Sequence, residues 1–221
     1  MKYIIGNFKQ HKRLDEYIDW KNKFFTDDLV IPEGLVCVLA PTYLNLQDLY
    51  EYLKENDRED LFLASQDVSQ YKQGKHTGLV GSDQVSDFAT FAIIGHSERR
   101  ADGDTLEIVN KKIGLAIENG LTPIVCFSDL SQYKSVFDNM DTKNILFAFE
   151  PLSAIGSGKP ESPGVINDMV KATGLNKVIY GGSVDVDNIS DYLKMSTVAG
   201  FLVGTATLDP LRFKALIKKF N

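Results

Sequence analysis

The side chains best suited to chemistry in this sequence stand directly after short apolar runs. Glu150 closes the run ILFAFE and is followed at once by Pro151, and His96 follows the run TFAIIG. Lys9 stands two residues after Asn7, at the end of YIIGNF. A carboxylate can take a proton from carbon, while an imidazole and an ammonium can stabilise the negative charge that develops on oxygen. These residue types indicate an acid–base site if the fold brings them together.

Each of these residues has a structural explanation when it is taken alone. Glu150 could be an ordinary strand-end acid, His96 a hydrogen-bonded structural histidine, and Lys9 a surface lysine. Glycines after apolar runs could simply allow tight turns. Their joint occurrence at the ends of several apolar runs favours the catalytic interpretation.

The elements that must position these residues alternate along the whole chain. Several apolar runs are hydrophobic at consecutive positions, which is typical of strands covered on both faces. Helical spacing is clearest in residues 14–25, 105–119 and 209–220, the last with Pro210 in its first turn. The expected strands are residues 3–8, 35–40, 61–66, 90–95, 121–127, 145–150, 177–181 and 200–204.

The repeated strand–helix pattern predicts one parallel sheet. Eight units in 221 residues is the count of a closed (β/α)8 barrel, eight parallel strands ringed by helices, and we expect a single domain over residues 1–221. The units at 67–89 and 128–144 are short, and an open doubly wound sheet is the alternative. Catalytic groups in such barrels gather at the C-terminal ends of the strands, where the residues above stand.

Composition argues against several kinds of partner. The net charge of −6 makes a general nucleic-acid surface an unfavourable assignment. No window approaches the roughly 18 apolar residues of a membrane span, and the start MKYIIGNFKQ lacks a signal-peptide pattern. Cys37 and Cys126 each lie inside an apolar run, so we expect buried free thiols and a reducing, cytoplasmic location.

Other enzyme templates do not fit the sequence. No G-x-G-x-x-G motif follows the first expected strand. Gly158 opens a pair that resembles a phosphate loop, but Pro160 stands where Ser or Thr must hold magnesium. His11, His76 and His96 have no metal-ligand spacing, so no metal site is expected.

With these residues placed, the chain closely resembles the triosephosphate isomerases, the family from which the (β/α)8 barrel takes its usual name. The resemblance rests on short blocks that run in the family's order from the first strand to the last. The blocks are GNFK (6–9), APTYL (40–44), IGHSERR (94–100), FEP (149–151) with AIGSGK (154–159), YGGSV (180–184) and GFLVG (200–204). It therefore covers the whole chain.

The resemblance implies interconversion of dihydroxyacetone phosphate and D-glyceraldehyde 3-phosphate through an enediolate, in glycolysis and gluconeogenesis and without a cofactor. Glu150 matches the family's catalytic base and His96 its electrophile at the carbonyl. Lys9 matches the cation beside the developing negative charge. Asn7 matches a neighbour at the substrate oxygens, and Glu98 a second acid beside the lysine.

The resemblance also implies a loop that closes over the glutamate and excludes water. Pro151 would fix the start of this loop, and glycines within it would supply backbone freedom. Ile155 and Leu202 would cover the glutamate, while Tyr180 and Ser183 would hold the closed loop. The N–H groups expected to bind the phosphate belong to Gly156, Ser183, Gly204 and Thr205.

Several positions depart from the family's pattern. Ser153 stands where the loop usually carries tryptophan, Asp129 where a glutamate follows the fifth strand, and Thr205 where a second glycine is usual. Pro160 should stiffen the second end of the loop. Leu79 replaces a glutamate that pairs in the family with an arginine of the second subunit.

The retained residues predict an active isomerase despite these departures. A catalytically degenerate barrel that only binds a phosphosugar is the alternative from a different class, and another phosphosugar isomerase is a third. A homodimer is expected. A tetramer is the alternative, because the chain is shorter than is usual for the family.

Overall fold

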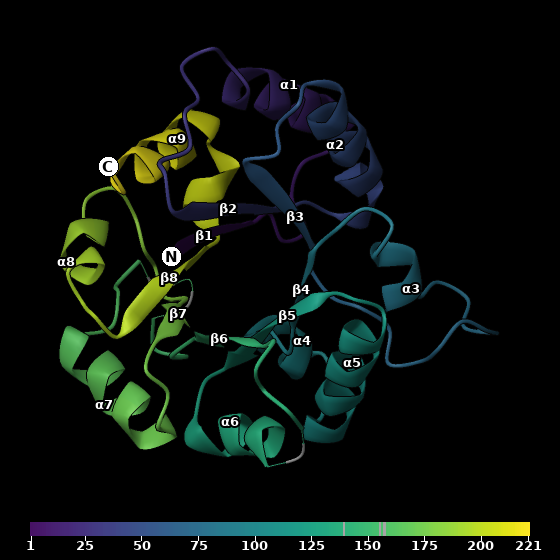
Figure 1. Ribbon diagram of the computed structural model, residues 1–221, viewed down its shortest axis with the longest axis vertical. Helices are drawn as coiled ribbons and strands as arrows, with labels where there is room; N and C mark the ends of the chain where they lie inside the picture. The colour runs from purple at the N-terminus through teal and green to yellow at the C-terminus, as the bar shows by residue number, and fades with distance from the viewer. Residues whose placement is uncertain (139, 155, 157) are drawn as a thin grey trace.

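The computed structural model of the chain describes residues 1–138, 140–154, 156 and 158–221. Its centre is a closed barrel of parallel strands in the order β1 to β8 (Figure 1). Because β1 pairs with both β2 and β8, the sheet closes on itself, which confirms the barrel and excludes the open sheet. The strands are β1 Lys2–Asn7, β2 Leu35–Ala40, β3 Leu61–Ser65, β4 Phe91–Ile94, β5 Thr122–Phe127, β6 Leu146–Phe149, β7 Val178–Tyr180 and β8 Val198–Val203.

Helices form a ring outside the strands (Figure 1). The expected helices at 14–25, 105–119 and 209–220 are present with ends shifted by no more than two residues. The units expected to be short hold α3, of four residues, and α6, of eight. In the described part of the chain the helices are α1 Leu14–Phe24, α2 Tyr43–Glu55, α3 Ser82–Val85, α4 Ser97–Ala101, α5 Leu106–Glu118, α6 Leu130–Phe137, α7 Pro163–Thr173, α8 Ile189–Leu193, the 3-10 helix η1 Thr205–Leu208 and α9 Pro210–Lys218.

Apolar side chains pack on both faces of the barrel wall. Alternate residues of the strands fill the interior, among them Ile5, Ile93 and Cys126. The other face packs against the helices through residues such as Trp20 and Cys37. Both cysteines are buried and free, as predicted. Burial of both strand faces holds the strand ends, and therefore the side chains that follow them, in fixed positions.

Acidic residues cap the starts of helices α6 and α9. Asp129 accepts two backbone N–H groups from the first turn of α6. Asp209 does the same for α9, with its Oδ1 atom 2.9 Å from the N atom of Leu211 and 3.1 Å from that of Arg212. Asp129, one of the departures from the family's pattern, thus has a structural role as a helix cap. None of the described helices is long and apolar enough to cross a membrane.

Candidate active site

A cavity of about 560 Å³ lies at the C-terminal ends of the strands. Its lining brings together Asn7 and Lys9 after β1, His96 after β4 and Glu150 after β6. The loops after β6, β7 and β8 and the first turn of α9 form the rest of the wall. The other predicted residues in this lining are Gly156, Ser183, Leu202, Gly204 and Thr205.

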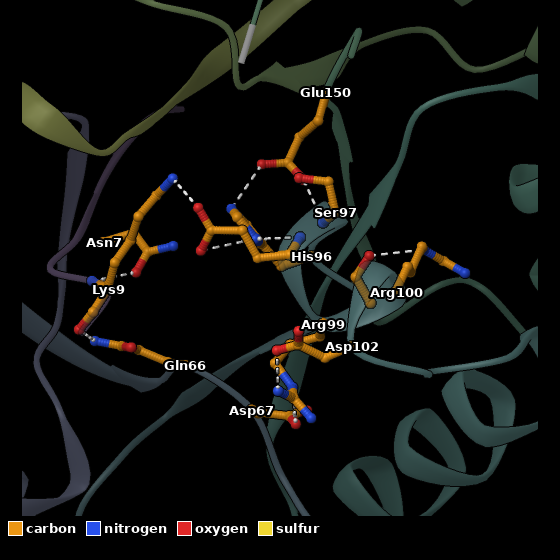
Figure 2. Close-up of polar contacts among 12 residues, drawn as sticks. Asn7, Lys9, Gln66, Asp67, His96, Ser97, Arg99, Arg100, Asp102 and Glu150 are labelled. Atoms are coloured by element: carbon orange, nitrogen blue, oxygen red, sulfur yellow. Dashed lines mark hydrogen bonds and ion pairs between the residues drawn. The ribbon is translucent and has the colours of Figure 1, made fainter. Parts of the chain in front are cut away.

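His96 is buried, and its ring is oriented by the backbone that follows it. Its Nδ1 atom accepts the N–H of Glu98 at 3.2 Å, while the carboxylate of that residue lies farther away, at 3.7 Å. A nitrogen that accepts an N–H carries no hydrogen of its own, so the ring is neutral with its hydrogen on Nε2. Nε2 faces Glu150, with 3.2 Å between it and Oε1 (Figure 2). His96 therefore presents a single N–H donor to the cavity.

Glu150 is only 3% exposed, yet both of its oxygens have partners. Oε1 faces His96, and Oε2 accepts the backbone N–H of Ser97 at 3.3 Å. Space for the carboxylate depends on Gly181, because a Cβ atom there would lie 3.0 Å from Cγ of Glu150. Burial, together with the charge of Glu150 and a hydrogen bond to it, raises the pKa of Cys126 well above its usual value. The thiol is therefore neutral and can donate to the carboxylate.

Lys9 is held at both its backbone and its ammonium group. Its φ of 51° is in the left-handed region, which is costly for a residue with a side chain and is often found at functional sites. Its N–H donates to Oδ1 of Asn7 at 2.9 Å, and Gln66 donates to its carbonyl at 3.0 Å. Nζ contacts Oε1 of Glu98 at 2.5 Å. The ammonium is thus directed into the cavity wall beside Asn7.

The ion pair between Lys9 and Glu98 is charged at neutral pH. Burial raises the pKa of the Glu98 carboxyl, but the hydrogen bond from Lys9 and the positive charge of Lys9 outweigh burial and hold this pKa below its usual 4.5. A substrate anion would meet a lysine whose position is already fixed by this carboxylate.

Three hydrogen bonds connect the loop after β6 to the last residue of β7 and the loop that follows it. Ser183 Oγ donates to the carbonyl of Ala154 at 2.6 Å and accepts the N–H of Gly158 at 3.2 Å. Tyr180, otherwise buried, accepts the N–H of Glu161 at 2.7 Å. Ser183 also has a positive φ of 52°. The structure therefore places both residues that were predicted to hold the loop against it.

The two ends of this loop also contact each other. Ser153 Oγ donates to Oε2 of Glu161 at 2.9 Å. Pro151 at the start of the loop is buried, and Gly156 within it has a φ of 64°, which is favourable only for glycine. Ile155, predicted to cover the glutamate, lies outside the described residues.

The loop after β8 offers backbone N–H groups next to Lys9. A Cβ atom on Gly204 would lie 3.3 Å from Cε of Lys9, which shows how closely the two approach. Thr205 is the first residue of η1, and its φ is not positive. The departure from glycine at this position is therefore compatible with the backbone and leaves its N–H available.

Several contacts of the site were not predicted from the sequence. Ser97 and Gly181 lie inside the motifs IGHSERR and YGGSV, so their position next to His96 and Tyr180 was a usable signal. Gln66, by contrast, contacts Lys9 across 57 positions of the sequence. Nothing in its local sequence indicates that contact.

The fold and the site define an enzyme of the (β/α)8-barrel class, with a carboxylate, a neutral imidazole and an ammonium at the C-terminal mouth of the barrel. The family model described as triosephosphate isomerase matches residues 2–220. The triosephosphate isomerase of Mycoplasmopsis pulmonis is 33% identical, over 97% of this chain and 96% of the relative. Those of Mycoplasma genitalium and Mycoplasma pneumoniae are 29% and 30% identical, over at least 94% of each chain. The chain belongs to the triosephosphate isomerase family and is an isomerase.

Proposed function

We propose that this enzyme interconverts dihydroxyacetone phosphate and D-glyceraldehyde 3-phosphate, with Glu150 as the base. The observation that carries the proposal is the contact of 3.2 Å between the Glu150 carboxylate and Nε2 of His96 inside the cavity. A base and a hydrogen-bond donor side by side can act on adjacent carbon and oxygen atoms of one small substrate. The names of the relatives supply the substrate pair.

In the first step, Glu150 takes the proton from the carbon beside the substrate carbonyl. The C–H electron pair moves into the carbon–carbon bond, and the carbonyl oxygen gains negative charge to give an enediolate. Nε2–H of His96 donates to that oxygen, and the Lys9 ammonium and Asn7 stabilise the charge. Return of the proton to the neighbouring carbon completes the isomerisation. One proton moves between carbons and one between oxygens, so the reaction balances without a co-substrate.

The burial of Glu150 contributes to this chemistry. A carboxylate that is 3% exposed is shielded from water, so its charge acts strongly on a bound substrate. Cys126 and the N–H of Ser97 hold it in place, and Gly181 leaves the space that its side chain occupies. A strand-end carboxylate is useful here because the following loop can close over it.

The phosphate group is assigned to the loops after β6, β7 and β8. Backbone N–H groups of Gly156, Ser183, Gly204 and Thr205 are the proposed donors, since these residues line one cavity with the acid–base pair. Tyr180 and Ser183 hold the loop after β6 by the hydrogen bonds described above, and Leu202 lies beside the glutamate.

The test is an assay of purified protein with glyceraldehyde 3-phosphate, beside Glu150→Asp. The shortened side chain misplaces the base, so we expect kcat to fall at least about 100-fold while competitive inhibition by inorganic phosphate is retained. Glu51→Asp, at an exposed glutamate of α2, is the matched control and should match the wild type.

Each other outcome of this assay has a definite meaning. Equal loss of phosphate binding and turnover in Glu150→Asp would point to a structural glutamate. A folded wild type without turnover that still binds phosphate would favour the degenerate phosphosugar-binding barrel. Faster turnover of another aldose or ketose phosphate would assign the enzyme to that substrate instead.

We also propose a homodimer that forms through the segment between β3 and α3. Residues 71–79 are all exposed, and this segment extends away from the barrel beside α3 (Figure 1). Leu79 at its end is 51% exposed, and contact with a second subunit would bury this apolar side chain. Light scattering should give a mass twice that of the 24.6 kDa chain, and the Leu79→Asp variant should give a lower measured mass. Four times that mass would identify the tetramer.

The proposed setting is glycolysis and gluconeogenesis in the cytoplasm.

A further inference from the structure

An ion pair lies in the wall of the cavity at its proposed phosphate end. Arg212, in the first turn of α9, donates through Nε to Oδ1 of Asp185 at 2.7 Å and through Nη2 to Oδ2 of the same carboxylate. Both residues belong to the lining that contains Ser183 and Thr205. Two parallel hydrogen bonds of this kind fix the guanidinium more firmly than a single contact would.

The carboxylate of this pair is held in place by its own loop. Asp185 Oδ1 accepts the N–H of Val186 at 2.7 Å, and the N–H of Asp185 donates to Oδ1 of Asn188 at 2.9 Å. Asn188 in turn donates to the carbonyl of Ser183 at 3.0 Å. The acid is thus tied to a residue of the proposed phosphate site and does not simply turn away into solvent.

The negative charge of Asp185 is unfavourable for the binding of a phosphate group in this cavity. Of the described residues in the lining, the basic ones are Lys9 and Arg212, and the acidic ones include Glu150, Asp185 and Asp187. Without the guanidinium, two aspartates would face an incoming dianion uncompensated. Repulsion between charges that lie closer together than the Debye length of about 8–10 Å survives moderate salt.

We propose that Arg212 sets the affinity of the enzyme for the substrate's phosphate group by neutralising Asp185. This inference rests on the proposed function and adds a specificity-determining residue to it. Arg212 lies in the wall beside the phosphate loops and contacts no group of the acid–base pair. Arg212 should therefore change the affinity for dianions and leave the rate of proton transfer unchanged.

The experiment compares Arg212→Gln with the wild type at low and high salt. We expect KM for glyceraldehyde 3-phosphate and KI for inorganic phosphate to rise together by about three- to tenfold at low salt, with kcat within about twofold. High salt should reduce both increases. Arg58→Gln is the matched control, because Arg58 makes the same two-bonded pair with Asp60 but does not line this cavity. It should leave KM and KI unchanged.

Asp185→Asn should change KI for phosphate in the opposite direction. This test is informative even if the Arg212→Gln protein does not fold. Removal of the acid should lower KI for phosphate, and Asp185→Asn added to Arg212→Gln should restore KI to near the wild-type value. An unchanged KI in Arg212→Gln, or a double variant that stays weak, would overturn the inference. A wild type that neither turns over nor is inhibited by phosphate would instead overturn the proposed function.

Discussion

At the scale of single residues, the contact between Glu150 and His96 depends on a backbone N–H. The N–H of Glu98 occupies Nδ1 of His96 and thereby directs the ring hydrogen on Nε2 toward the cavity. His96→Gln should therefore lower kcat at least about 100-fold, because the amide cannot place the same donor on the substrate oxygen. Isomerase assays measure kcat, and phosphate inhibition should be retained. Loss of folded protein by circular dichroism would show that His96 is mainly structural.

The pKa of Glu98 gives the pH dependence of the Lys9–Glu98 pair a definite sign. Since the pKa is lowered in the folded protein, the pair is intact above the usual 4.5 and is lost only as pH falls through the lower folded value. Glu98→Gln should reduce kcat/KM by a ratio that stays constant from neutral pH down to 4.5 and shrinks only below it. A pH–rate profile of both proteins checks this. A ratio that already shrinks near pH 6 would contradict the assignment.

How much of the site the sequence predicts depends on how local each contact is. Glu150 and His96 could be found because each directly follows an apolar run and the barrel brings strand ends together. The N–H of Ser97 reaches Glu150 across 53 positions, and Arg212 reaches Asp185 across 27. Such contacts are set by the register and tilt of the strands and leave no pattern in the local sequence.

At the scale of elements, the loop after β6 is closed on itself by the bond between Ser153 and Glu161. The hydrogen bonds from Ser162 and Ser153 lower the pKa of Glu161, so its carboxylate is charged and accepts from Ser153 at neutral pH. Ser153 occupies the position of the family's usual tryptophan. The bond therefore gives this chain its own connection between the two ends of the loop.

Ser153→Ala should loosen this loop, because it removes the donor to Glu161. We expect kcat/KM to fall by less than about tenfold, since one exposed hydrogen bond contributes modestly. Glu161→Ala should have the same effect, and the double variant should be no worse than either single variant. Steady-state kinetics of the four proteins test this. Additive losses would show that the two residues act separately.

The sequence predicts the strands of this fold well, and the errors have a physical cause. The eighth strand was expected from residue 200 but begins at Val198. Gly200 therefore lies inside the strand, where a Cβ atom would be 2.1 Å from the carbonyl oxygen of Tyr3 in β1. That glycine marks a close approach between two strands and not the start of one. No local pattern separates these two uses of glycine.

At the scale of the whole molecule, a buried lysine joins segments that are distant in the sequence. Lys112 of α5 is 4% exposed, and its Nζ lies 2.7 Å from Oδ2 of Asp67 and 2.6 Å from Oδ2 of Asp104. Arg99 adds a second cation to Asp67 at 3.3 Å. The network ties the segment after β3 to α5 and to the loop before it.

Lys112→Met should lower the free energy of unfolding by about 3–5 kcal/mol, because it removes the ion-pair partner of the largely buried Asp104 carboxylate and leaves Asp67 with Arg99 alone. Chemical denaturation measures the change. Lys111→Met, which removes only an exposed partner of Glu107, is the control and should cause no measurable loss. We expect a single transition, because we propose that residues 1–221 form one domain. Equal stability of the two variants would show that the network is not stabilising.

The two cysteines can report which layer of the barrel opens first during unfolding. Burial raises the pKa of both thiols, so neither forms the reactive thiolate while the protein is folded. Cys126 faces the interior of the barrel, and Cys37 faces the helices. A thiol reagent should therefore label Cys37 alone when a helix detaches, but both residues together when the barrel opens. The order in which the two are modified would reveal whether this enzyme unfolds from its outer layer inward or all at once.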